Sequence, residues 1–338
     1  MGGSVGGIPE IPILKSDLGD AIDFGVQGDK GPKTLSSVVA KKMNDRRGLL
    51  GMLGVLVFWS FGPALSKKAG TPPLVTVFYR MWLALLLHWV LGFAIGHAPS
   101  MQTLKRTAAP GLMFAANIVV FFYALQHASV ANVSMISALQ PVVVLFLAGP
   151  LFGERLSRWD VGWTLVALVG ASIAVLSSNS AKATTKTSTV GVMLSLGVLF
   201  SFTGYFLLSK RASGHTTERA AIHPVTYMAG VLTTATILVT PVCLIVVGPS
   251  ALGRLSLPNV GWIILIVFVP SMGHLLMSLT HRYVAVSISS LAMLVQPMTA
   301  SLVAWPINGQ PLVAMQAVGA LIVIGALGAV IGHRNRAN

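Results

Sequence analysis

Long apolar runs, separated by short polar or basic segments, fill the chain from residue 48 to residue 332. A helix needs about 20 mostly apolar residues to cross the ~30 Å hydrocarbon core of a bilayer, because it rises about 1.5 Å per residue. By this measure the pattern predicts an all-α integral membrane protein with ten transmembrane helices. They cover residues 48–66, 73–96, 109–126, 130–151, 159–178, 190–209, 224–247, 259–281, 284–306 and 312–332.

The apolar pattern is duplicated. Gln140-Pro141 begins one segment, and Gln296-Pro297 begins another 156 positions later, with proline, glycine and leucine recurring at the same offset after both pairs. Several matched positions at a single offset indicate an internal repeat. Ten helices in two copies give five helices per copy. Because five is odd, the second copy enters the membrane from the opposite side, so the two repeats are predicted to be inverted.

The predicted organisation has five parts. Residues 1–47 hold six of the nine acidic residues and no sustained apolar period, so they are predicted to be a mostly disordered tail. A short helix near residues 35–43 is the alternative for part of it. The first repeat then covers residues 48–178, the second covers residues 190–332, and the polar linker 179–189 joins them. Residues 333–338 form a C-terminal tail. The turn between the eighth and ninth helices is placed at His281-Arg282-Tyr283.

Composition and charge agree with this assignment. Only 9% of the residues are charged and 54% are hydrophobic, with a mean hydropathy of +0.78, whereas soluble domains carry roughly 25% charged residues. A net charge of +14 would suggest nucleic acid in a soluble protein. Here the basic residues lie mostly at the ends of apolar runs, so the lipid bilayer, and no nucleic acid, is the predicted partner. The excess of Lys and Arg on one side predicts that both termini are cytoplasmic.

Several short motifs of the first copy occur together. They are Trp59, Lys67-Lys68, Pro72-Pro73 followed by Arg80, and the segment from Gln140-Pro141 to Gly153-Glu154-Arg155. With ten helices in two repeats, they resemble the EamA-type family of the drug/metabolite transporter superfamily over residues 48–332. The resemblance implies a secondary transporter, often an exporter of amino acids or small metabolites, in a bacterial inner membrane. The second copy departs from the pattern, because Gly309-Gln310 replaces Gly153-Glu154 and no arginine matches Arg80.

Arg80 is the only charged residue well inside a predicted helix, about 12 Å along the helix from Pro72. A charge within the membrane is costly and usually faces protein or water. One interpretation is a guanidinium that attracts a substrate carboxylate or another anion. The alternative is a structural arginine that reaches the interface or binds the carbonyls of a neighbouring helix.

Pro141 and Pro297 are predicted to interrupt the fourth and ninth helices, because proline lacks the N–H group that a helix needs. Transporter binding sites often form at such paired interruptions near the middle of the membrane, and a kink used for packing is the alternative. Gln140 and Gln296 would offer neutral hydrogen bonds there.

Four further polar or aromatic residues complete the predicted substrate pathway. Trp59 and Tyr205 lie on matching faces of the first and sixth helices, where they line a cavity or else pack in the core. Asn117 and His274 are polar groups in apolar surroundings. His274 is either a proton carrier or a hydrogen-bonded partner of another helix. The predicted pathway residues are Trp59, Arg80, Asn117, Gln140, Tyr205, His274 and Gln296. Glu154 is expected to form an ion pair or cap a helix.

The sequence offers no catalytic or metal-binding cluster within the predicted helices, so no enzyme activity, cofactor or metal site is predicted. We expect a secondary transporter in the cell (inner) membrane that moves a small metabolite, such as an amino acid, outward by alternating access. A channel, a non-transporting scaffold and an intramembrane enzyme are the alternatives. The glycines of the tenth helix fit either close helix packing or a homodimer contact.

Overall fold

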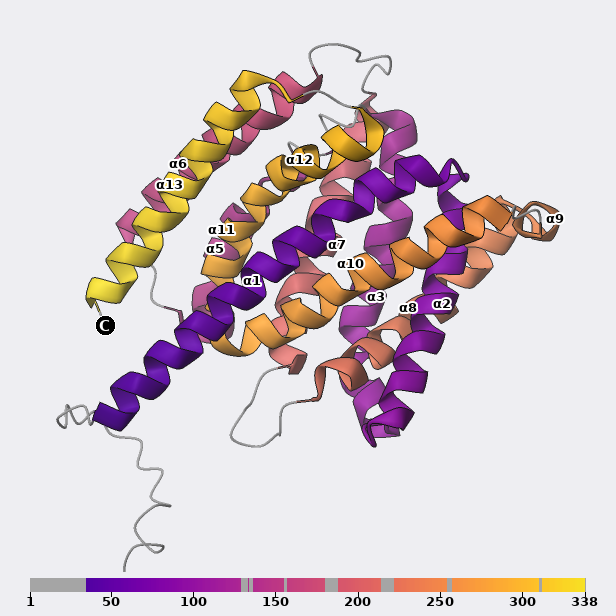
Figure 1. Cartoon of the computed structure of the whole chain (residues 1–338), viewed down its shortest axis with the longest axis horizontal. Helices are drawn as coiled ribbons and strands as arrows, with labels where there is room; N and C mark the ends of the chain where they lie inside the picture. Colours follow the sequence, from indigo (N-terminus) through magenta and orange to yellow (C-terminus); the bar gives the residue numbers. More distant parts are fainter. Residues whose placement is uncertain are drawn as a thin grey trace, which may run out of the picture. The chain divides into compact units, whose positions relative to one another are not determined.

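The computed structural model describes residues 35–128, 133, 136–154, 157–179, 188–213, 222–253, 257–309 and 312–337. The chain divides into two units, Met1–Lys42 and Met43–Asn338. All regular elements in the described residues are helical (Figure 1). They are α1 (Leu35–Ala69), α2 (Pro73–Ala94), α3 (Met101–His127), α5 (Gln140–Phe152), α6 (Arg158–Asn179), α7 (Thr189–Ser213), α8 (Pro224–Val246), α9 (Pro249–Leu252), α10 (Leu257–Tyr283), α11 (Val286–Ala292), the 3₁₀ segment η1 (Met293–Val295), α12 (Gln296–Asn308) and α13 (Ala314–Ala337).

The helices present apolar side chains outward. In the described part of the chain, eight helical segments are long and apolar enough to cross a membrane, among them Pro224–Val246 and Ala314–Arg334, and α5 is a shorter apolar helix. Ile245, Phe146 and Leu321 are 83%, 76% and 70% exposed. Outward apolar surface on this scale matches a lipid environment rather than water. The predicted class, an all-α integral membrane protein, is confirmed, and the count of ten helices stays a prediction.

The duplicated sequence segments build matching structures. Helices α5 and α12 each contain 13 residues and begin at a Gln-Pro pair. Each ends at a glycine in the left-handed conformation, Gly153 with φ 65° and Gly309 with φ 66°. Glycine is the residue that adopts this conformation without steric cost, which explains why both helices stop there. The inversion of one copy relative to the other remains a prediction.

Two boundaries differ from those predicted. His281, Arg282 and Tyr283 form the last turn of α10 rather than a connecting turn, and the chain turns at residues 284–285 instead. The helix continues because the Lys210 ammonium donates to the carbonyls of His281 and Val284, which satisfies its C-terminal end. At the other end of the chain, α1 begins at Leu35, so residues 35–47 are helical. The predicted linker residues 180–187 and residues 1–34 lie outside the described residues.

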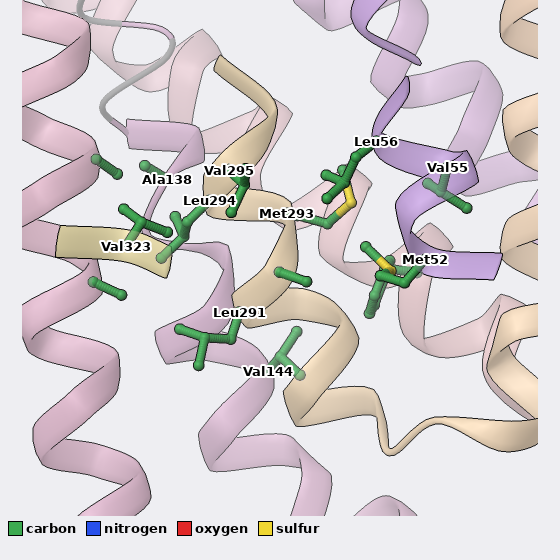
Figure 2. Close-up of a cluster of buried hydrophobic side chains, with 14 of the residues drawn as sticks. Met52, Val55, Leu56, Ala138, Val144, Leu291, Met293, Leu294, Val295 and Val323 are labelled. Atoms are coloured by element: carbon green, nitrogen blue, oxygen red, sulfur yellow. The ribbon is translucent and has the colours of Figure 1, made fainter. Parts of the chain in front are cut away.

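Two apolar clusters form the core around α7. One joins α1, α5, α6, α7, α10, α11, α12 and α13, and Figure 2 shows Leu56 of α1 beside Met293 of η1. The other joins α2, α3, α7, α8 and α10. Phe202 of α7 packs against both clusters. The face of α7 that carries Phe202 and Tyr205 therefore lies where the two clusters meet.

Helices α6 and α13 lie side by side, as Figure 1 shows in magenta and yellow. A Cβ atom on Gly319 would lie only 2.5 Å from the carbonyl oxygen of Gly170, so this glycine serves close packing within the chain. By contrast, a Cβ atom on Gly325, Gly328 or Gly332 would meet no atom within 4 Å. The predicted homodimer contact through this helix stays a prediction.

Candidate functional site: a central aromatic and polar cluster

Five ring side chains from four helices meet where the two apolar clusters join, and Arg80 of α2 interacts electrostatically with two of them. We call these six residues the central cluster. They are Trp59 (α1), Arg80 (α2), Phe114 (α3), Phe202 and Tyr205 (α7), and His274 (α10). Ring contacts link five of these residues, and Arg80 lies within electrostatic reach of Tyr205 and His274. The structure thus brings four of the seven predicted pathway residues together.

His274 lies at the middle of this cluster. Its Nδ1 atom is 3.2 Å from the Tyr205 hydroxyl, and its ring centroid is 4.7 Å from that of Trp59 and 5.3 Å from that of Phe114. His274 and Tyr205 are only 8% and 2% exposed. If Nδ1 of the neutral ring accepts a hydrogen bond from the phenol, the ring proton sits on Nε2. That atom has no hydrogen-bond partner among the described residues.

Trp59 is held by close packing of α1 on α10. A Cβ atom on Gly273 would lie 2.3 Å from Cδ1 of the Trp59 ring. Further along the same pair of helices, a Cβ atom on Gly51 would lie 2.5 Å from the Thr280 hydroxyl. These glycines let α1 approach α10 closely enough to place the indole against His274.

Arg80 has no compensating charge in the described part of the chain. Its side chain is only partly exposed and is deeply surrounded by protein, yet the guanidinium makes no hydrogen bond or ion pair with a described residue. After residue 45 the sequence has three acidic residues, Glu154, Asp160 and Glu218. The first two pair with Arg334, and Glu218 lies outside the described residues. The guanidinium therefore remains available to another anion.

Asn117 is engaged in helix packing. Its amide nitrogen donates to the carbonyl oxygen of Val198 at 3.2 Å and to the hydroxyl of Ser201 at 3.3 Å. These bonds tie α3 to α7 one turn after Phe114. Phe114 was not among the predicted pathway residues. It lies three residues before Asn117, and residues three apart share a helix face, so the polar Asn117 was the available signal that Phe114 faces another helix.

The two Gln-Pro pairs lie at interruptions of the helical backbone. A turn at residues 138–139 precedes Gln140, and the 3₁₀ segment η1 precedes Gln296. Pro141 and Pro297 occupy the first turns of α5 and α12, where a missing N–H group breaks no internal hydrogen bond. Gln140 is 3% exposed with an unpartnered Nε2 atom, whereas Gln296 is half-buried. Among the described residues, no hydrogen bond joins either glutamine to the central cluster.

A second polar group, which we call the corner network, consists of Glu154, Asp160, Arg334 and Ser287. The Glu154 carboxylate accepts the N–H group of Val286 at 2.6 Å and the Ser287 hydroxyl at 2.5 Å, and its distance to Arg334 is 3.8 Å. Arg334 also donates to both carboxylate oxygens of Asp160, at 3.3 and 3.1 Å. The expected ion pair and helix cap of Glu154 are confirmed.

Sequence reasoning did not select Asp160 and Arg334, although a local signal was present. Ser157 and Asp160 form a capping box, with reciprocal bonds of 3.1 Å between the side chain of each and the N–H group of the other. The S-x-x-D spacing before an apolar run is the sequence signature of this cap. Its partner Arg334, 174 residues away, has no such signal.

A histidine pair lies where the end of α2 meets the start of α8. The rings of His97 and His223 stack with centroids 4.5 Å apart and an interplanar angle of 1°. The Arg282 guanidinium donates to the neighbouring carbonyl of Ile222. Burial lowers the pKa of His223, and the nearby His97 and Arg282 lower it further. These neighbours therefore favour the neutral form of His223.

Comparisons with known proteins identify relatives of part of the chain. Residues 46–176 match the EamA-like transporter family. The chain is also 31% identical over 128 residues to the pseudopaline exporter CntI of Pseudomonas aeruginosa, in strain UCBPP-PA14 and in strain PAO1. That match spans 37% of this chain and 45% of the exporter. A solved crystal structure superimposes with a TM-score of 0.68 at 16% identity, covering 86% of this chain and 98% of the other, which shows a shared fold.

Proposed function

We propose that this chain, whose residues 46–176 match the EamA-like transporter family, is a secondary transporter that exports a small metabolite by alternating access. The observation that carries the proposal is the pair of matching interrupted helices. Helices α5 and α12 begin at equivalent Gln-Pro pairs and end at equivalent left-handed glycines. A membrane protein tolerates interrupted backbone only where protein or water satisfies the freed polar groups.

The substrate pathway in this proposal runs past the central cluster and the two interruptions. Among the described residues, the Arg80 guanidinium of the cluster makes no hydrogen bond or ion pair, and Gln140 Nε2 at the start of α5 is buried without a hydrogen-bond partner. Buried polar groups normally have partners, so these two groups are candidate hydrogen-bond partners for a substrate. The named relative exports pseudopaline, which supports outward transport of a small metabolite here.

Counterflow into proteoliposomes tests the proposal. The full chain is reconstituted, and a panel of labelled amino acids, nucleosides and organic anions is tested for exchange at two pH gradients. Saturable exchange of one class, competed by its unlabelled form, supports a carrier. Protein-free liposomes are the matched control.

Two outcomes contradict the proposal in different ways. Flux that neither saturates nor shows counterflow indicates a channel. A lack of exchange across the whole panel, with monodisperse protein of verified orientation, argues against transport of these classes and favours a membrane scaffold.

A further inference from the structure

We propose that the central cluster binds the carboxylate of an organic monoanion, with Arg80 as the charge partner and the aromatic rings as the wall for the rest of the molecule. This inference deepens the proposed function, on which it rests, by naming the chemical class of substrate. It depends on three observations: an uncompensated guanidinium, an adjacent hydrogen-bond donor, and an apolar surround.

The first observation is the charge of Arg80. A guanidinium within a membrane helix is costly unless an anion or an aqueous space compensates it. In the described residues both candidate carboxylates, Glu154 and Asp160, are already bound to Arg334. The protein therefore supplies a cation in the span of α2 and leaves the matching anion to be supplied by a ligand.

The second observation is the paired geometry of Tyr205 and His274. Their 3.2 Å hydrogen bond fixes the imidazole between Trp59 and Phe114. In the tautomer whose Nδ1 accepts from the phenol, Nε2 carries the ring proton and can donate to a ligand. Arg80 lies within electrostatic reach of both groups. A carboxylate has two oxygen atoms, so it can accept from the planar guanidinium and from one further donor at once.

The third observation limits the ligand's charge and shape. Arg80 is the one cation of the central cluster, so a monoanion leaves the bound pair neutral, whereas a dianion such as phosphate would leave a net negative charge in a low-dielectric site. Trp59, Phe114 and Phe202 surround the imidazole and the phenol with apolar ring faces. Such faces favour an apolar or planar organic group beside the carboxylate.

Ligand binding in lipid nanodiscs tests the inference without relying on transport. The probes are four pairs of a monoanionic acid and its neutral amide: acetate and acetamide, benzoate and benzamide, N-acetylleucine and its amide, and N-acetylphenylalanine and its amide. Saturation-transfer NMR measures binding to the full wild-type chain and to Arg80→Gln, Arg80→Lys and Lys105→Gln. Lys105 is exposed, so the last variant removes one positive charge away from the cluster.

We expect wild type and Lys105→Gln to bind at least one acid in preference to its amide. Arg80→Gln should weaken binding of that acid about 10- to 100-fold, because a charge-assisted hydrogen bond is lost. Arg80→Lys should lie between, since lysine keeps the charge and loses the planar fork. Equal binding of the acid by wild type and folded Arg80→Gln overturns the inference, as does a wild type that prefers no acid over its amide.

A measurement on the unmutated chain covers the case in which Arg80→Gln does not fold. Phenylglyoxal modifies accessible arginine side chains, and peptide mass spectrometry reports the modified fraction at Arg80 with and without benzoate. Protection of Arg80 by benzoate and not by benzamide is expected, with Arg334 as the unprotected reference. Equal protection by both compounds, or none by either, overturns the inference. Counterflow that succeeds while these tests fail leaves the proposed function standing.

Discussion

At the scale of single residues, the central cluster depends on a glycine as much as on its aromatic rings. Gly273 lies directly before His274 on α10, and the Trp59 ring occupies the space that a side chain at position 273 would need. The indole therefore rests on the backbone of α10, beside the imidazole at a ring distance of 4.7 Å. A methyl group at position 273 would have to displace either the ring or the whole of α1.

We predict that Gly273→Ala destabilises the protein by about 1–3 kcal/mol, the usual cost of forcing an extra carbon into a packed core. Thermal unfolding in detergent measures the loss, and tryptophan fluorescence reports the displaced ring. Gly261→Ala is the matched control, because a Cβ atom there would meet nothing within 4 Å on the same helix. Equal effects of the two substitutions would contradict this packing arrangement.

At the scale of elements, helix ends in this protein are capped by side chains from distant helices. Glu154, which follows α5, accepts hydrogen bonds from the first two N–H groups of α11, 132 and 133 residues away. A carboxylate at a helix N-terminus satisfies unpaired donors and complements the helix dipole. The corner network thereby links the end of α5 to the start of α11.

We predict that Glu154→Ala lowers the unfolding free energy by about 2 kcal/mol, because it uncaps α11 and leaves Arg334 with one partner fewer. Glu154→Gln should cost less, since an amide oxygen can still accept one of the N–H groups. Denaturant or thermal unfolding measures both. Arg158→Ala, at an exposed position of the same corner, serves as the control and should change little. A Glu154→Ala protein as stable as wild type would show that the cap contributes nothing.

The stack of His97 and His223 between α2 and α8 predicts a dependence of stability on pH. Because the pKa of His223 is lowered in the folded state, the unfolded chain binds the proton more readily below its ordinary value of 6.5. The contribution of His223 is therefore complete at pH 7.5 and is lost as the pH falls below about 6.5. His223→Gln should flatten this part of the profile, measured as Tm from pH 5 to pH 8. His127→Gln, at an exposed position, should leave the slope unchanged.

At the scale of the whole molecule, structural features that follow from periodic or repeated sequence patterns could be predicted. Features that depend on contacts between residues far apart in the sequence could not. Apolar run length predicted the membrane class, and the repeated Gln-Pro pairs predicted the interruptions that precede α5 and α12. The end of α10 was misplaced, because Lys210 of another helix stabilises residues that look like a polar turn. Arg334 was missed for the same reason, since its partners lie 174 and 180 residues earlier. Such contacts follow from packing and leave no periodic signal.

Orientation is the property of the whole molecule that a direct experiment can decide. The excess of basic residues in short loops predicts that Ser100 lies in the cytoplasm and Ser250 outside. Both serines are exposed, and the single natural cysteine, Cys243, is buried, so Ser100→Cys and Ser250→Cys in a Cys243→Ala background give a matched pair. An impermeant thiol reagent should label Ser250→Cys in intact cells, and Ser100→Cys only after the membrane is opened. The reverse pattern would place the corner network outside the cell. Labelling of both in intact cells would contradict a fixed orientation altogether.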